Sequence, residues 1–181
     1  MNEVKKGRLA VVAMALWLAG CGGERSLPPD VPLPIGMARA KVVKVLEGDT
    51  VAVVSRNGVE QTIRLLSVDC PEADQPFGRE SAQMTAELTL GRDVVITEMG
   101  RDRSQRILGE IRLADGRQLN RELVSAGACW WSRKYAPDDR TLRELEASAR
   151  SNRRGLWAGK RDPMPPWEWR KRSSPDARVG P

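Results

Sequence analysis

Acidic and arginine side chains gather in three short stretches of this 181-residue sequence. The stretches are residues 47–50 (EGDT), residues 64–72 (RLLSVDCPE) and residues 102–106 (DRSQR). The chain contains no histidine. Ser-His-Asp and Cys-His nucleophile systems, and sites in which histidine binds zinc or copper, are therefore excluded for the chain acting alone. Any enzymatic chemistry must use carboxylates, Arg, Lys, Tyr or a hard metal ion.

The residue types in these stretches suit chemistry at a phosphate group. Asp49 and Asp69 offer hard oxygen donors on two turns, which suits Ca²⁺. Glu72 follows Pro71, whose fixed φ helps to aim the carboxylate, and a carboxylate can act as a general base on water. Arginine guanidiniums bind phosphate through planar forks and neutralise developing charge. Each stretch alone also fits an ordinary turn or a solvated ion pair, so their order along the chain is the stronger signal.

Short segments rich in Val, Ile and Leu must position these stretches. Strands are predicted at residues 40–46, 50–55, 60–68, 93–98 and 106–113. Asn57-Gly58 favours a hairpin between the second and third of them. Helices are predicted at residues 78–90, 118–126 and 141–154, each closed by a glycine. Because residues 40–68 leave no room for crossovers, we predict an α+β fold, a five-stranded OB-fold β-barrel with about three α-helices.

In their order, the three stretches and a later Gly-Leu-Trp resemble the motifs of the staphylococcal nuclease (thermonuclease) family. That family carries a D-G-D-T turn, an R-L-x-x-(I/V)-D-x-P-E segment, a D-(R/K)-Y-G-R segment and a final G-L-W. Here they stand at residues 47–50, 64–72, 102–106 and 155–157. The resemblance covers residues 38–160. It implies an OB barrel with helices and metal-dependent hydrolysis of phosphodiester bonds in DNA and RNA, typically with Ca²⁺.

The resemblance also implies a role for each matching residue. The implied catalytic residues are Arg64, Glu72 and Arg106. In this reading the glutamate is the general base that activates a water for in-line attack on phosphorus. The implied Ca²⁺ ligands are Asp49, Asp69 and the backbone carbonyl of Cys70. Side chains expected beside these ligands are Glu47 and Thr50. Side chains expected to contact the substrate are Arg103 and Tyr135.

The sequence departs from the family pattern at three places. Glu47 replaces the first Asp of the turn, and Ser104-Gln105 replaces the Tyr-Gly before Arg106. Arg133 stands where some relatives carry an aromatic contact to the nucleotide. All five proposed metal-binding and catalytic side chains are nevertheless present, which favours a nuclease with little sequence preference. The alternatives are a non-catalytic OB-type module that binds nucleic acid or an envelope partner, and a structural lipoprotein whose charges are solvated.

Two of the three cysteines, Cys70 and Cys129, lie within the predicted domain. An even pair in an oxidising compartment favours a disulfide, and two free buried thiols are the alternative. The family resemblance places the two segments side by side, so that a disulfide would tie the metal-binding loop to the barrel. The neighbouring Trp130-Trp131 is expected to belong to the core, with a nucleic-acid stacking platform as the alternative.

The N-terminal segment predicts export. Residues 1–20 combine three Lys or Arg with an apolar run at residues 9–18, which is typical of a signal peptide and too short to span a bilayer. Residues 18–21 (LAGC) resemble a bacterial lipobox, so we predict lipidation at Cys21. An ordinary secretory signal is the alternative. Gly22 resembles the pattern sorted to an outer membrane, which predicts a lipid-anchored protein of the Gram-negative envelope, facing the periplasm or the exterior. We expect the protein to be a monomer.

The remaining segments flank the domain. Residues 21–37 contain four prolines and predict an extended tether. Residues 38–160 form the nuclease-like domain. Residues 161–181 are a Trp-, Pro- and Arg/Lys-containing tail that we predict to be extended, with Trp167 and Trp169 either packed on the domain or waiting for a partner.

Overall fold

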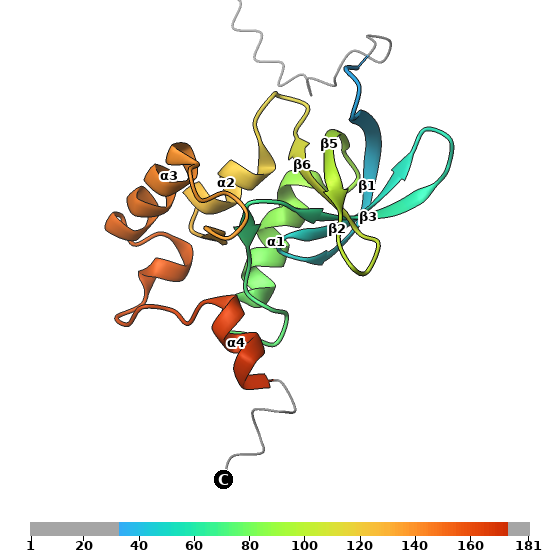
Figure 1. Cartoon of the computed structure of the whole chain (residues 1–181). Coiled ribbons are helices and arrows are strands. Elements are labelled where there is room, and N and C mark those ends of the chain that lie inside the picture. Colours follow the sequence, from blue (N-terminus) through green and yellow to red (C-terminus); the bar gives the residue numbers. More distant parts are fainter. Residues whose placement is uncertain (1–32, 174–181) are drawn as a thin grey trace, which may run out of the picture.

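A computed structural model describes residues 33–173 (Figure 1). The predicted signal peptide, Cys21 and most of the tether lie outside these residues. Among residues 33–173, no helix is both long and apolar enough to cross a membrane.

Five strands close into a barrel in the order β1-β2-β3-β6-β5. They are β1 (Met37–Glu47), β2 (Thr50–Ser55), β3 (Glu60–Leu65), β5 (Asp93–Arg101) and β6 (Ile107–Arg112). Neighbouring strands are antiparallel except β3 and β6, which run parallel. The prediction of an α+β fold built on a five-stranded OB-type barrel is therefore confirmed.

Buried apolar side chains from the barrel strands close around one core. Val42, Val51, Ile63 and Ile111 have almost no exposed surface and come from four different strands. The β2–β3 hairpin turns at Gly58, whose φ of +79° is the left-handed conformation that Asn-Gly turns require.

The strand predicted at residues 60–68 is interrupted, which the sequence pattern did not indicate. β3 ends at Leu65, and Ser67 adopts a φ of +69° that turns the chain out of the barrel. The next two residues form the separate short strand β4 (Val68–Asp69), which pairs with β7 (Trp130–Trp131). This break places Asp69 beyond the barrel edge.

Residues 33–173 contain four α-helices and one 3-10 helix. They are α1 (Gly78–Thr89), α2 (Leu119–Ser125), α3 (Arg140–Ser151), η1 (Gly155–Ala158) and α4 (Pro166–Ser173). Of these, α1 and α2 pack on the barrel. Asp139 caps α3 by accepting a hydrogen bond from the Leu142 N–H at 2.9 Å. A second apolar cluster, centred on Trp130 and Trp157, lies next to α3 and η1.

The prediction of an extended C-terminal tail is wrong for residues 166–173. The tail's prolines do not prevent a helix here, because Pro166 is its first residue, where a missing N–H costs no hydrogen bond. The Pro165 carbonyl instead accepts from the N–H groups of Glu168 and Trp169. In Figure 1, α4 lies below α1, near the loop that follows β4.

Candidate active site

Adjacent strands bring the first acid and the first arginine together. Thr50 at the start of β2 is the register partner of Arg64 near the end of β3. Asp49 immediately precedes Thr50, and its carbonyl accepts the Leu65 N–H at 2.8 Å. The hairpin therefore places the Asp49 and Arg64 side chains at the same barrel edge.

Arg64 bridges two buried carboxylates. Its guanidinium forms ion pairs with Asp49 and, at 2.8 Å, with Asp69. Asp49 is 2% exposed and Asp69 is 6% exposed. The second Asp49 oxygen accepts the Cys70 N–H at 2.8 Å, and the Thr50 hydroxyl donates to the first at 3.0 Å. Removing one of these side chains would leave a buried charge without its partner, so each substitution here is expected to destabilise the fold.

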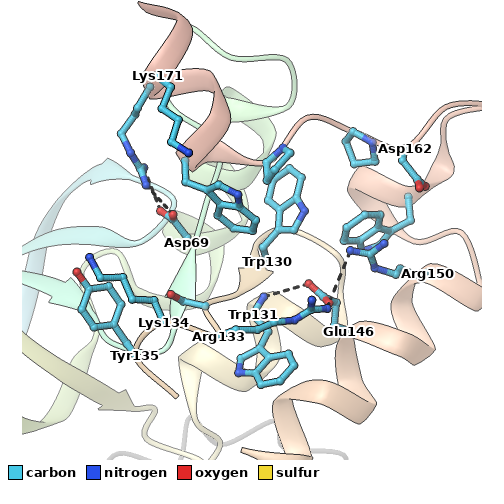
Figure 2. Close-up of a pocket in the computed structure, with 16 residues that line it drawn as sticks. Asp69, Trp130, Trp131, Arg133, Lys134, Tyr135, Glu146, Arg150, Asp162 and Lys171 are labelled. Atoms are coloured by element: carbon cyan, nitrogen blue, oxygen red, sulfur yellow. Dashed lines mark hydrogen bonds and ion pairs between the residues drawn. The ribbon is translucent and has the colours of Figure 1, made fainter. Parts of the chain in front are cut away.

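Arg170, from α4, also belongs to this site, and the sequence pattern did not predict it. Arg170 donates to both Asp69 oxygens, at 3.1 Å and 2.7 Å, and also forms an ion pair with Glu72. In Figure 2, dashed lines mark the contact at the labelled Asp69 carboxylate. Hydrogen bonding to Asp69 raises the pKa of the Arg170 guanidinium despite partial burial, so Arg170 remains charged. We call Asp49, Arg64, Asp69, Glu72 and Arg170 the acid–arginine group.

Arg106 occupies a different place from the other predicted catalytic residues. It directly precedes β6, the strand that pairs with β3, and the next residue, Ile107, is the parallel register partner of Ile63. Among the contacts described for residues 33–173, its guanidinium pairs with Asp102 at 2.7 Å. Burial raises the pKa of Asp102, but hydrogen bonds from the side chain and backbone of Arg106 and from the Ser104 N–H outweigh it and lower this pKa.

Cys70 and Cys129 are joined by a disulfide with a Cα–Cα distance of 4.1 Å. The two-residue pairing of β4 with β7 sets this position, since Asp69 is the register partner of Trp130. The bond fastens the segment that follows Asp69 to the segment that precedes β7.

Among residues 33–173, no three His, Cys, Asp or Glu side chains are clustered in a way that could hold a metal ion. The acids that we predicted as Ca²⁺ ligands, Asp49 and Asp69, are instead bridged by guanidiniums. Glu47 ends β1 opposite Thr50, so both lie next to Asp49 in the turn.

Residues 62–159 match the family described as staphylococcal nuclease homologue. The chain belongs to this family. Its relatives include a protein of Escherichia coli named "uncharacterized endonuclease", 44% identical over 133 residues, which are 73% of this chain and 84% of the relative. A "micrococcal nuclease" of Shigella flexneri is 37% identical over 147 residues, covering 75% of this chain and 82% of that protein. The predicted family resemblance is confirmed.

The staphylococcal nuclease homologue match ends before α4. Arg64, Asp69 and Glu72 lie within the matched segment, whereas Asp49 precedes it and Arg170 follows it. The basic run at residues 170–172 is visible in the sequence, but it carries no information about what Arg170 contacts.

One departure from the family's motifs leaves its turn intact. Gln105 stands where the family motif has Gly, and it takes a φ of +64°. The Asp102 N–H donates to the Arg106 carbonyl at 3.0 Å, closing the turn between β5 and β6. Arg103 lies on this turn and is exposed.

A pocket of about 700 Å³ adjoins Asp69 and extends toward α3 and α4 (Figure 2). Tyr135, predicted to contact substrate, lines it and is 55% exposed. The interpretation of Trp130 and Trp131 as core is confirmed, because both are almost fully buried. Trp167 packs on the domain, with its ring centroid 6.5 Å from that of Trp130.

Proposed function

We propose that this chain is a Ca²⁺-dependent nuclease that hydrolyses phosphodiester bonds in DNA and RNA with little sequence preference. The observation that carries the proposal is the acid–arginine group at one edge of the barrel. Membership of the nuclease family and the nuclease-named relatives support nucleic-acid hydrolysis.

In this proposal Glu72 is the general base, and Arg64 and Arg106 bind the phosphate. Glu72 is partly exposed, so water can reach its carboxylate, which would accept a proton from the attacking water. Arg64 and Arg106 would bind the phosphate and neutralise charge on its oxygens as the bond to the leaving group breaks. Arg64 lies in β3 and Arg106 directly precedes the neighbouring strand β6, and in this proposal both approach one phosphate.

The types of donor atom, rather than their present contacts among residues 33–173, fit Ca²⁺. Asp49 and Asp69 are buried carboxylates, and the Arg64 guanidinium forms ion pairs with both. The two acids thus already bind one positive charge between them. These two acids, with the Cys70 carbonyl, are the proposed ligands, since Ca²⁺ prefers oxygen donors. When bound, the ion would polarise the phosphate and lower the pKa of a water molecule.

We also propose that the protein is a monomer held in the cell envelope by a lipid on Cys21. The lipobox-like residues 18–21 and the Pro-rich residues 21–37 support this location, because a tether would let the domain reach a polymer away from the membrane. Replacing Cys21 with Ser should move the protein from the membrane fraction to the soluble fraction. Retention of Cys21→Ser in membranes would contradict the anchor.

The activity is tested with purified protein on plasmid DNA and on RNA, each with Ca²⁺, with Mg²⁺ and with a chelator. Glu72→Gln and Arg106→Ala are each expected to lower turnover by about 10²- to 10⁴-fold. Their effect on DNA binding should be small, because nonspecific affinity rests on many phosphate contacts. Glu80→Gln is the matched control, since Glu80 is exposed on α1.

Two outcomes would contradict the proposal. If Glu72→Gln degraded DNA as fast as the unmodified protein under saturating Ca²⁺, the general-base assignment would fail. If the purified protein bound DNA without cutting it under any metal condition, the non-catalytic binding module would be the better account.

A further inference from the structure

We propose, on the basis of the nuclease function above, that Arg170 is a positioning residue of the active site. In this proposal α4 delivers a guanidinium that holds the Glu72 carboxylate against Asp69, in the arrangement that the reaction uses. The catalytic domain would then extend beyond the family-matched residues 62–159 to include α4.

The first argument is the geometry of the contact. Arg170 grips Asp69 with both terminal nitrogens, at 3.1 Å and 2.7 Å, and the same Nη1 also donates to Glu72. Bidentate guanidinium–carboxylate pairs fix orientation as well as distance. Because Asp69 is itself held by Arg64, the contact continues a chain of alternating charges from Asp49 to Glu72.

The second argument is the unequal burial along this chain. Asp49 and Asp69 are fixed by the barrel edge and by β4, whereas Glu72 follows Pro71 on a loop and its side chain is 24% exposed. Within residues 33–173, Arg170 is the described hydrogen-bond partner of the Glu72 carboxylate. A general base on a loop needs such a partner, because displacement of a reacting group by about 1 Å can cost about 10²-fold in rate.

The third argument is that α4 is docked by contacts other than Arg170. The Trp169 indole N–H donates to Asp74 at 3.1 Å, and the Gln75 side-chain amide donates to the Met164 carbonyl at 2.6 Å. Trp167 packs edge-on against Trp130. The helix thus rests on the same loop that carries Glu72, and removing the guanidinium alone should leave it in place.

The fourth argument is charge. Asp49, Asp69 and Glu72 contribute three negative charges, and Arg64 and Arg170 contribute two positive charges, which leaves a net charge of −1. Without Arg170 the three acids would face one arginine, and the net charge of the group would be −2. Arg170 therefore halves the net negative charge that gathers at this edge of the barrel.

The main competing interpretation is a blocking contact. Arg170 would then compete with a cation for Asp69 and with water for Glu72, and it would have to leave before the reaction. The two interpretations give opposite signs for the effect of removing the guanidinium, so one variant separates them.

The experiment compares Arg170→Gln and Arg170→Lys with Arg172→Gln, which changes an exposed arginine of the same helix. For each full-length variant, kcat and KM on plasmid DNA, the Tm and the Ca²⁺ affinity by calorimetry without DNA are measured. Glu72→Gln is measured in parallel.

We expect Arg170→Gln to lower kcat by about 10- to 10²-fold, with KM within about threefold. Arg170→Lys should recover part of kcat, because it keeps the charge and loses the planar fork. Arg172→Gln should match the unmodified protein. Ca²⁺ affinity should not fall in Arg170→Gln, since a positive charge has been removed.

Each other outcome overturns the proposal. If kcat stayed unchanged and only the Tm fell, Arg170 would be purely structural. Faster cleavage by Arg170→Gln at low Ca²⁺, with Ca²⁺ bound at least tenfold more tightly, would establish the blocking contact. Should Arg170→Gln fail to fold, an unchanged kcat in Arg170→Lys would count against positioning. An active Glu72→Gln would refute the proposed function itself, whereas an inactive Glu72→Gln with a fully active Arg170→Gln would refute only the role of Arg170.

Discussion

Replacing Gln105 with Gly is expected to stabilise the folded chain. Gln105 has a φ of +64°, in the left-handed region, where a residue other than Gly costs about 1–2 kcal/mol. The turn dictates this conformation. Asp102 and Arg106 close a loop of three residues between β5 and β6, and the last residue of such loops is usually left-handed.

The gain is smaller than the strain, because Gly loses more conformational freedom on folding. That loss is about 0.5–1 kcal/mol, so the free energy of unfolding should rise by about 0.5–1 kcal/mol, the difference between strain and entropy. For a domain of this size the Tm should rise by about 1–4 °C. Turnover should be unchanged, because the backbone that carries Arg106 keeps its path.

Urea unfolding of the two proteins measures the difference directly. Ser104→Gly is the control, since Ser104 is the adjacent residue and lies outside the left-handed region. The free energy of unfolding of this control should fall by about 0.5–1 kcal/mol. Gly loses more conformational entropy on folding than Ser does, and the substitution relieves no backbone strain. If Gln105→Gly were no more stable than the unmodified protein, the argument that this turn is strained would be refuted.

Three further perturbations test the loops and turns that carry the predicted site residues. In Gly48→Ala, the new methyl would meet the Ser81 side chain and lie 2.8 Å from the Cys70 Cβ, so thermal unfolding should show a loss of about 1–3 kcal/mol. An unchanged Tm would contradict this tight packing. Reducing the Cys70–Cys129 disulfide should cost about 2–4 kcal/mol in urea unfolding, and equal stability with and without reductant would argue against the bond. Asp102 has a lowered pKa in the folded chain, so its stabilising effect is present above its unfolded pKa and is lost as pH falls through the folded value. Asp102→Asn should therefore be less stable than the unmodified protein at pH 7 and equally stable in strong acid, and a pH-independent difference would refute the linkage.

Much of the barrel could be predicted from the sequence, because its signals are local. The Asn57-Gly58 turn and the runs of Val and Ile each depend on a few neighbouring residues. The order of the acidic and arginine stretches predicted that Asp49, Arg64, Asp69 and Glu72 would lie together, and ion pairs link Asp49 and Asp69 through Arg64 and Asp69 and Glu72 through Arg170. The same reasoning placed Arg106 with them, whereas its described guanidinium contact is with Asp102.

The features that the sequence did not reveal depend on long-range contacts. Arg170 and Asp69 are 101 residues apart, and no period or spacing links them. The helix that carries Arg170 was missed because Pro165 and Pro166 usually end helices, and their harmless place at a helix start depends on how the segment docks. The break at Ser67 likewise depends on the pairing of β4 with β7 rather than on local propensity.

The separation of Arg170 from Asp69 has a consequence for how the protein is made. A ribosome synthesises the carboxylates about one hundred residues before the guanidinium that holds them. A chain cut by a protease or a premature stop codon just before Arg170 would keep the whole family-matched segment and the disulfide, but lose this cation. Such a fragment would pass for an intact nuclease by sequence comparison and by its oxidised cysteines. If Arg170 positions Glu72, this fragment would lose most of its activity, and full activity would require chains translated beyond Arg170.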